Sequence, residues 1–295
     1  MSPVARRWLE VIVPAGVEAV EAVSEILTRI GHQGIAVELP LSPDVRGGTD
    51  HLVKAYVLDD GDVVAKVSDV RDALGHLQAF GLGPIGELSA REIKEEDWLE
   101  SWKAQFTPLR IGCFFVRPTW SDATADPGAT LLVLDPGMAF GTGLHPTTQQ
   151  ALEALSTLAV EGKSLLDVGT GSGILAIAAA RRGASPVVGV DTDPLAVEAA
   201  RENAERNGVA IPVGDGSAAD VPGRFDFVIA NIVSPVLQQI APDLVARLAP
   251  RGTLVVAGIA APAEPLTRDA FVRAGLIVLD RDQRDDWVAL AMRRR

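Results

Sequence analysis

The stretch Ser164-Leu165-Leu166-Asp167-Val168-Gly169-Thr170-Gly171-Ser172-Gly173-Ile174 joins a short apolar run to an Ala-rich segment through three alternating glycines. A short apolar run bounded by glycine predicts a buried strand, and the Ala-rich segment predicts a helix from 174 to 182. Glycines at such a junction let the chain turn tightly and let a ligand lie against bare main chain. The stretch therefore predicts a parallel α/β sheet with a ligand site at the carboxyl end of this strand.

Strand and helix patterns continue to alternate downstream of this stretch. Further strands are expected at 187–190, near 211, at 225–230, at 253–257, near 277 and near 288. Further helices are expected at 194–207, 235–248 and 262–274. Apolar strands that alternate with helices are typical of a mostly parallel sheet covered on both faces, so we assign residues 108–295 to an α/β, Rossmann-like domain. Strands at about 111–117 and 130–134 lead into it.

The chain upstream of residue 94 has a different pattern. Residues 1–93 read as strand, helix, strand, strand, helix, strand, which is the split βαβ, ferredoxin-like order of a smaller α+β domain. Residues 94–107 place Trp98, Trp102 and Phe106 at successive i, i+4 steps, which predicts a short amphipathic connector helix. No motif for chemistry lies in residues 1–93, so we interpret them as a substrate-recognition module.

Composition and charge exclude several classes of protein. The 295 residues suggest about two domains, and 47% hydrophobic against 22% charged residues is typical of a globular chain. The net charge of −12 disfavours broad binding of nucleic acid, and residues 1–97 carry 17 acidic against 9 basic side chains. A single cysteine, Cys113, cannot form an internal disulfide or a thiolate metal cluster. With no long apolar run and no signal-peptide pattern at the start, we expect a cytoplasmic protein that uses no metal and no membrane.

Polar residues follow two of the predicted strands. Asp191 ends the strand at 187–190, where a carboxylate can accept hydrogen bonds from both hydroxyls of a ribose. Asn231 ends the strand at 225–230, where its amide oxygen can accept a hydrogen bond from an amine. Asp193, just before Pro194, is expected to cap the next helix. Asn231 as a cap for the helix after it is the alternative.

The glycines alone leave the ligand open. Gly171, Gly173 and Ala176 also satisfy the dinucleotide fingerprint, and Asp191 follows Gly171 by twenty residues, as the acid of such sites does. A nicotinamide-dependent oxidoreductase therefore remains an alternative. A non-catalytic ribosome-assembly module built on the split βαβ domain is a second alternative, although basic and aromatic residues do not interleave in it.

Residues 134–148 are rich in glycine and hydroxyl side chains and are expected to form a loop over the same edge of the sheet. From the residues alone, Thr147 and Thr148 read as turn residues. His145 reads either as a proton relay or as a residue that holds this loop in shape, and it is left outside the assigned site residues.

Together these segments resemble the PrmA family, the bacterial methyltransferases of the eleventh large-subunit ribosomal protein. The resemblance rests on Glu96-Asp97-Trp98 to Trp102, on residues 135–148, 167–173, 190–194 and 231–235, and on Trp287-Val288. It implies a class I methyltransferase domain with a seven-stranded sheet that binds S-adenosylmethionine. It also implies trimethylation of the α-amine and of lysines in a small, basic ribosomal protein, and we expect a monomer that does not bind nucleic acid directly.

The resemblance also assigns residues to roles. It implies that Thr148, Gly169, Asp191 and Asn231 contact S-adenosylmethionine, with Asn231 also beside the transferred methyl group as the catalytic residue. The sequence departs from the family pattern at Val233-Ser234, where Leu-Ala is usual, and at Thr170, where Cys is common. Neither change removes a group that the resemblance places in contact with the cofactor.

Overall fold

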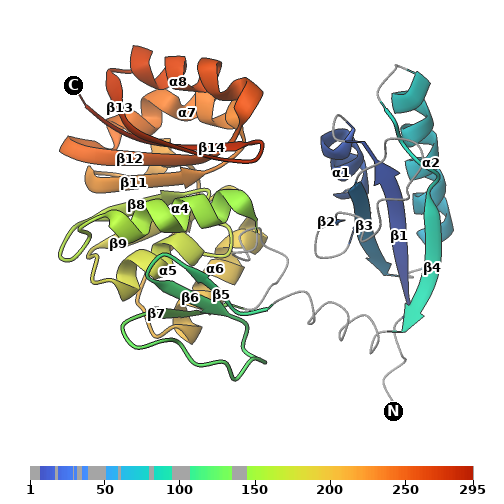
Figure 1. The fold of residues 1–295 in the computed structure, drawn as a ribbon, viewed down its shortest axis with the longest axis horizontal. Coiled ribbons are helices and arrows are strands. Elements are labelled where there is room, and N and C mark those ends of the chain that lie inside the picture. Colours follow the sequence, from blue (N-terminus) through green and yellow to red (C-terminus); the bar gives the residue numbers. More distant parts are fainter. Residues whose placement is uncertain are drawn as a thin grey trace. The chain divides into compact units, whose positions relative to one another are not determined.

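The computed structural model describes residues 7–16, 19–28, 30–31, 35–38, 51–58, 61–79, 83–94, 107–134 and 145–294 (Figure 1). The chain divides into two compact units, Met1–Gln105 and Phe106–Arg295. The predicted connector helix at 94–107, apart from its two end residues, and most of the predicted loop at 134–148 lie outside the described residues. Lys94 ends a strand instead.

The first unit is built on a four-stranded antiparallel sheet in the order β2-β3-β1-β4. Its elements in chain order are β1 (Arg7–Ala15), α1 (Val20–Thr28), β2 (Ile35–Glu38), β3 (His51–Leu58), α2 (Val63–Ala79) and β4 (Ser89–Lys94). Each helix connects two parallel strands that have a third strand between them, which is the predicted split βαβ arrangement.

Alternation along β1 separates two faces of this sheet. Val11, Val13 and Ala15 belong to one buried cluster with side chains from both α1 and α2. On the opposite face Glu10 is also buried, where it accepts a hydrogen bond from the Tyr56 hydroxyl at 3.2 Å and pairs with Arg91. Both helices therefore cover the same face, as the period-2 pattern of β1 predicts.

The second unit contains a seven-stranded sheet in the order β10-β9-β8-β11-β12-β14-β13. All neighbouring strands are parallel except where β14 pairs antiparallel with β12 and with β13. The strands are β8 (Leu165–Val168), β9 (Val187–Asp191), β10 (Val213–Asp215), β11 (Phe225–Asn231), β12 (Leu248–Ala260), β13 (Leu276–Arg284) and β14 (Trp287–Arg294). The predicted mostly parallel sheet is confirmed, with β10 two residues beyond the expected position near Ile211.

Helices cover both faces of this sheet, so two hydrophobic clusters flank it. The first face carries α4 (Pro146–Thr157), α5 (Ile174–Arg181) and α6 (Pro194–Arg206), and the second carries α7 (Ser234–Ala246) and α8 (Glu264–Arg273). Short 3-10 turns lie at Ala218–Asp220 and Ala261–Ala263. No helix among the described ranges is long and apolar enough to cross a membrane.

A separate three-stranded sheet precedes α4. It is formed by β5 (Leu109–Ile111), β6 (Phe114–Arg117) and β7 (Thr130–Val133), with β7 at one edge. The side chain of Asn207 pairs with this edge, because its Nδ2 donates to the Val133 carbonyl at 2.7 Å and its Oδ1 accepts the Val133 N–H at 2.8 Å. An amide side chain thus occupies the place of a neighbouring strand residue.

Candidate functional site

The ends of β9, β8 and β11 lie side by side. Val168 is in register with Val190 on one side and with Ala230 on the other, so Gly169 follows at the level of Asp191 and Asn231. Neighbouring strands are about 4.8 Å apart, which places these last two residues two strand spacings apart. Because side chains alternate along a strand, both point to the face covered by α4 and α5.

The glycine loop after β8 bends sharply. Gly169, Gly171 and Gly173 have φ values of 69°, 55° and 82°, a conformation that side chains disfavour. A Cβ at Gly173 would also lie 3.1 Å from the Ala200 Cβ, against α6. The loop can therefore present bare backbone at the start of α5, as its sequence predicts.

Asp167 holds this loop from beneath. Its fully buried carboxyl accepts hydrogen bonds from the Thr170 hydroxyl at 2.7 Å and from the Ala176 N–H at 3.1 Å. Burial raises the pKa of Asp167 to about 6, although both hydrogen bonds lower it. Asp167 is thus a structural part of the loop, a role that the sequence analysis did not assign to it.

Asp191 lies over the same loop. Its Oδ2 accepts the Gly171 N–H at 2.8 Å, and its Oδ1 accepts the Asp193 N–H at 3.0 Å. Each carboxylate oxygen has a second lone pair, so the group can still accept hydrogen bonds from a ligand. Asp193 caps α6 by accepting the Leu195 N–H at 2.9 Å, and the cap predicted from the sequence is confirmed.

Asn231 contacts α4. Its Nδ2 donates to the Thr148 hydroxyl at 3.3 Å, and its Oδ1 is buried with no hydrogen-bond partner among the described residues. The N-cap of α7 is Val233, so the alternative of Asn231 as a helix cap is wrong. A buried acceptor without a partner costs free energy, and it is a group that a ligand N–H can satisfy.

Thr148 does not belong to a loop. The expected loop at 134–148 ends by residue 145, because Pro146 begins α4 and Thr148 lies in its first turn. His145 is the N-cap, and its Nδ1 accepts the Thr147 N–H at 3.3 Å. Pro at the first helical position is typical of a helix start, a signal that the sequence analysis missed.

The β13–β14 hairpin is tied to α4 near the candidate site. Gln150, which is buried, donates from Nε2 to the carbonyls of Asp282 at 3.2 Å and Trp287 at 3.1 Å. The rings of Trp287 and His145 meet edge to face with centroids 5.1 Å apart. These contacts place the Trp287 ring beside the start of α4. In the sequence, the only signal for a role of Trp287 was its place among the segments that resemble the family.

The comparisons with known proteins agree with this geometry. The model of the family described as ribosomal protein L11 methyltransferase (PrmA) matches residues 7–295. This chain belongs to the PrmA family. Ribosomal protein L11 methyltransferase from Pelotomaculum thermopropionicum is 40% identical, with 97% of this chain and 98% of that protein covered. The protein of the same name from Geobacter sulfurreducens is also 40% identical, with 98% of both chains covered.

A solved PrmA-family structure supports the fold. The crystal structure of the ribosomal protein L11 methylase from Lactobacillus delbrueckii subsp. bulgaricus is 33% identical, with a TM-score of 0.61, and the match covers 64% of this chain and all of that one. The predicted Rossmann-like methyltransferase fold is therefore confirmed.

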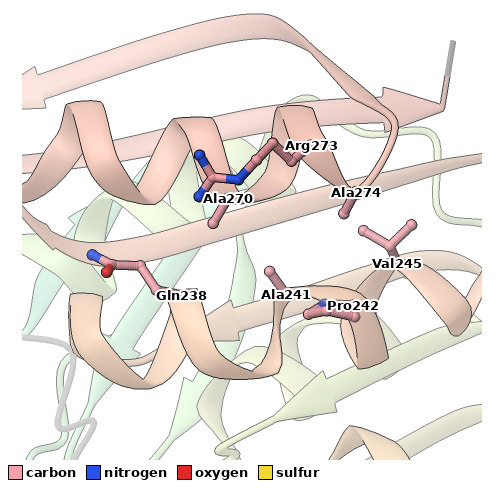
Figure 2. Close-up of a pocket in the computed structure, with 7 residues that line it drawn as sticks. All are labelled: Gln238, Ala241, Pro242, Val245, Ala270, Arg273 and Ala274. Carbon is pink, nitrogen blue, oxygen red and sulfur yellow. The ribbon is translucent and has the colours of Figure 1, made fainter.

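A groove of about 480 Å³ lies elsewhere in this PrmA-family chain. It runs between α7 and α8 and is lined mainly by Pro242 and small residues, with Gln238 and Arg273 as its polar side chains (Figure 2). Both helices cover the face of the sheet opposite to α4, α5 and α6. The groove thus contains none of the predicted site residues. Among the described residues no group of three or more His, Cys, Asp or Glu side chains has a metal-binding arrangement.

Proposed function

We propose that this chain transfers methyl groups from S-adenosylmethionine to amines of ribosomal protein L11. The observation that carries the proposal is the pairing of two features at one sheet edge. A carboxylate, Asp191, lies over a bare glycine loop. On the other side of Gly169 lies the buried amide oxygen of Asn231, which has no partner in the part of the chain that the structure describes.

The residues at this edge suit the cofactor. Asp191 would accept hydrogen bonds from the ribose hydroxyls, and the loop at Gly169 would let the ligand lie against main chain. Thr148 would complete the contacts from α4. When bound, S-adenosylmethionine supplies a methyl group on a positively charged sulfur.

Asn231 is the residue that we propose to act on the amine. Its Oδ1 would accept an N–H of the substrate and turn the nitrogen lone pair toward the methyl group. With the lone pair so oriented, the nitrogen would bond to the methyl carbon as the carbon–sulfur bond of the cofactor breaks. After the first and second transfers the new ammonium would lose a proton to water before the next, whereas the third transfer would leave a quaternary ammonium that has no proton to lose. The nucleophile must be neutral, which is easier for an α-amine with a pKa of about 7.7–8.0 than for lysine at about 10.4. Desolvation in the site lowers the pKa of either amine.

The finer assignments follow from the same reasoning. We propose that the α-amine and lysine ε-amines are carried to the trimethyl state, and that residues 1–93 recognise the substrate. Their acidic excess, 17 acidic against 9 basic side chains over residues 1–97, would attract a basic ribosomal protein rather than RNA. A monomeric, cytoplasmic enzyme that binds no nucleic acid completes this proposal.

The ribose contact is tested by Asp191→Ala. Removal of a charge-assisted hydrogen bond worth roughly 1.5–3 kcal/mol would weaken S-adenosylmethionine binding roughly 10- to 150-fold by calorimetry. Asp193→Ala is the matched control, because its carboxylate caps α6 and should leave the cofactor Kd unchanged. Equal affinities of wild type and Asp191→Ala would contradict the ribose contact.

The choice of cofactor is tested by titration with NADH. Tight NADH binding, with no binding of S-adenosylmethionine, would instead favour the nicotinamide-dependent oxidoreductase.

The reaction itself is tested by mass spectrometry of purified ribosomal protein L11 after incubation with enzyme and cofactor. We expect mass increases in steps of one methyl group, and fragment spectra would locate the modified amines. An unchanged mass in the presence of a protein that binds the cofactor would contradict the proposed activity and favour a non-catalytic binding module.

A further inference from the structure

The regular pairing of β12, the strand next to Asn231, is interrupted at the level of this residue. β11 pairs with β12 in register through Asn231 and Ala257, and the pairing of β12 with β14 then shifts between Val256 and Ile259. Gly258 lies within this irregularity with φ of +81°, a value that favours glycine. β12 therefore bulges at the level where β11 ends.

The bulge brings the backbone of Gly258 against the backbone of Ile232. A Cβ at Gly258 would lie 2.6 Å from the Ile232 carbonyl oxygen and 2.9 Å from its carbonyl carbon. The Cβ would also lie 3.1 Å from the Ile232 nitrogen, which is bonded to Asn231 and whose N–H donates to the Ala257 carbonyl at 3.2 Å. Both peptide groups of Ile232 are thus held against β12. Because the atoms in contact are main chain, no rotamer change could relieve the overlap.

Ile232 also contacts the glycine loop from its other side. Its Cγ1 and Cδ1 atoms fill the space that a Cβ at Gly169 would occupy, at 2.7 and 2.8 Å. Ile232 thus lies between two glycines, with its backbone against Gly258 and its side chain against Gly169. Of these two contacts, only the one between the Ile232 side chain and Gly169 can be relieved by a change of rotamer.

We infer that Gly258 is a positioning residue that sets the place of the Asn231 amide through the Ile232 peptide. The inference rests on the amine-orienting role proposed for Asn231. Any side chain at 258 pushes Ile232 away from β12, and the peptide bond carries Asn231 with it. Asp191 belongs to β9, two strands away, and keeps its place.

The inference predicts a separation of chemistry from cofactor binding. To reach ordinary contact, the Ile232 carbonyl must move by roughly 0.5–1 Å, and a misplacement of about 1 Å at a reacting group can reduce a rate roughly 100-fold. We therefore expect Gly258→Ala to lower kcat for L11 methylation roughly 10- to 100-fold. The calorimetric Kd for S-adenosylmethionine should rise by a smaller factor than kcat falls, since the ribose contact of Asp191 is retained while only the contacts at Asn231 and Gly169 shift.

Gly223→Ala is the matched control. Gly223 has φ of +87°, close to that of Gly258, and beyond its chain neighbours a Cβ there would meet no atom of a described residue within 4 Å. Both substitutions place a side chain at a similar positive φ, but only the one at 258 meets Ile232. Gly223→Ala should keep wild-type kcat, and a loss equal to that of Gly258→Ala would overturn the inference.

A double-mutant cycle decides whether Gly258 acts through Asn231. We expect Asn231→Ala alone to lower kcat. When Gly258→Ala is added to Asn231→Ala, the further loss of kcat should be less than about twofold. If Gly258→Ala gives the same factor in both backgrounds, the positioning role is wrong and the role of Asn231 stands. If Asn231→Ala keeps wild-type kcat, the role of Asn231 is wrong and the positioning role is wrong with it.

Gly258→Asn guards against loss of folding, because Asn tolerates positive φ better than Ala but also has a Cβ. Expressing kcat per titrated cofactor site removes any unfolded fraction from the comparison. We expect Gly258→Asn to repeat the loss, and full kcat per site in this variant would overturn the inference.

Discussion

The Asp167 carboxyl is the most deeply buried acid of the candidate site, and its two hydrogen bonds shape the glycine loop. Its pKa is raised by burial to about 6, whereas an aspartate in the unfolded chain titrates near 3.9. The folded state therefore holds this proton at higher pH than the unfolded chain does. Its contribution to stability is complete below about pH 4 and is lost as the pH rises through about 6.

The direction of this pH dependence predicts the behaviour of the variant Asp167→Asn, whose side chain cannot ionise. Between pH 4 and 7 the free energy of unfolding of wild type should fall relative to the variant by up to about 3 kcal/mol, from a difference of about two pH units. Urea unfolding at several pH values measures it. Asp226→Asn is a control of opposite sign, because a hydrogen bond from the Ser164 N–H lowers the pKa of Asp226. Parallel pH profiles for wild type and Asp167→Asn would contradict the prediction.

At the scale of the element, α4 depends on the imidazole at its start. Burial lowers the pKa of His145, which keeps the ring neutral and its Nδ1 able to accept the Thr147 N–H. His145→Ala should lose about 1 kcal/mol of stability, whereas His145→Asn should retain the cap. Both variants lose the ring contact with Trp287, so the difference between them in urea unfolding isolates the cap. Equal stabilities would show that the cap contributes nothing.

Sequence patterns predicted most elements of the second unit because their apolar runs are short, regular and bounded by Gly, Pro or Asp. They failed at α4, where Pro146 and two β-branched threonines resemble a turn and a histidine replaces the usual cap residue. They placed β10 two residues early, because Ile211 is apolar but precedes Pro212, which cannot donate in a ladder.

The site was predictable only in part, for a similar reason. Asp191 and Asn231 end two parallel strands that flank β8, so the sheet order alone brings them to one edge. The contacts of Gln150 with the β13–β14 hairpin depend on the antiparallel insertion of β14, which periodicity does not reveal. The closeness of Gly258 to Ile232 depends on a bulge, for which an isolated glycine in a strand is the only sequence signal.

At the scale of the whole molecule, the two units have separate hydrophobic clusters. We therefore expect a variant that lacks residues 1–105 to fold and to bind S-adenosylmethionine with wild-type affinity. If residues 1–93 within this segment recognise the substrate, methylation of L11 should fall more than about 100-fold, or roughly 3 kcal/mol of binding energy. Activity assays on L11 beside calorimetry with the cofactor measure the two effects. Full methylation by the truncated variant would contradict the division of roles.

The pairing of Asn207 with Val133 has a consequence for solubility. An open strand edge is a template on which another chain can add, and this leads to aggregation. The amide of Asn207 uses both main-chain groups of Val133 at the edge of β7. A single side chain thereby blocks strand addition at Val133, so this point of the β7 edge is covered without an extra strand.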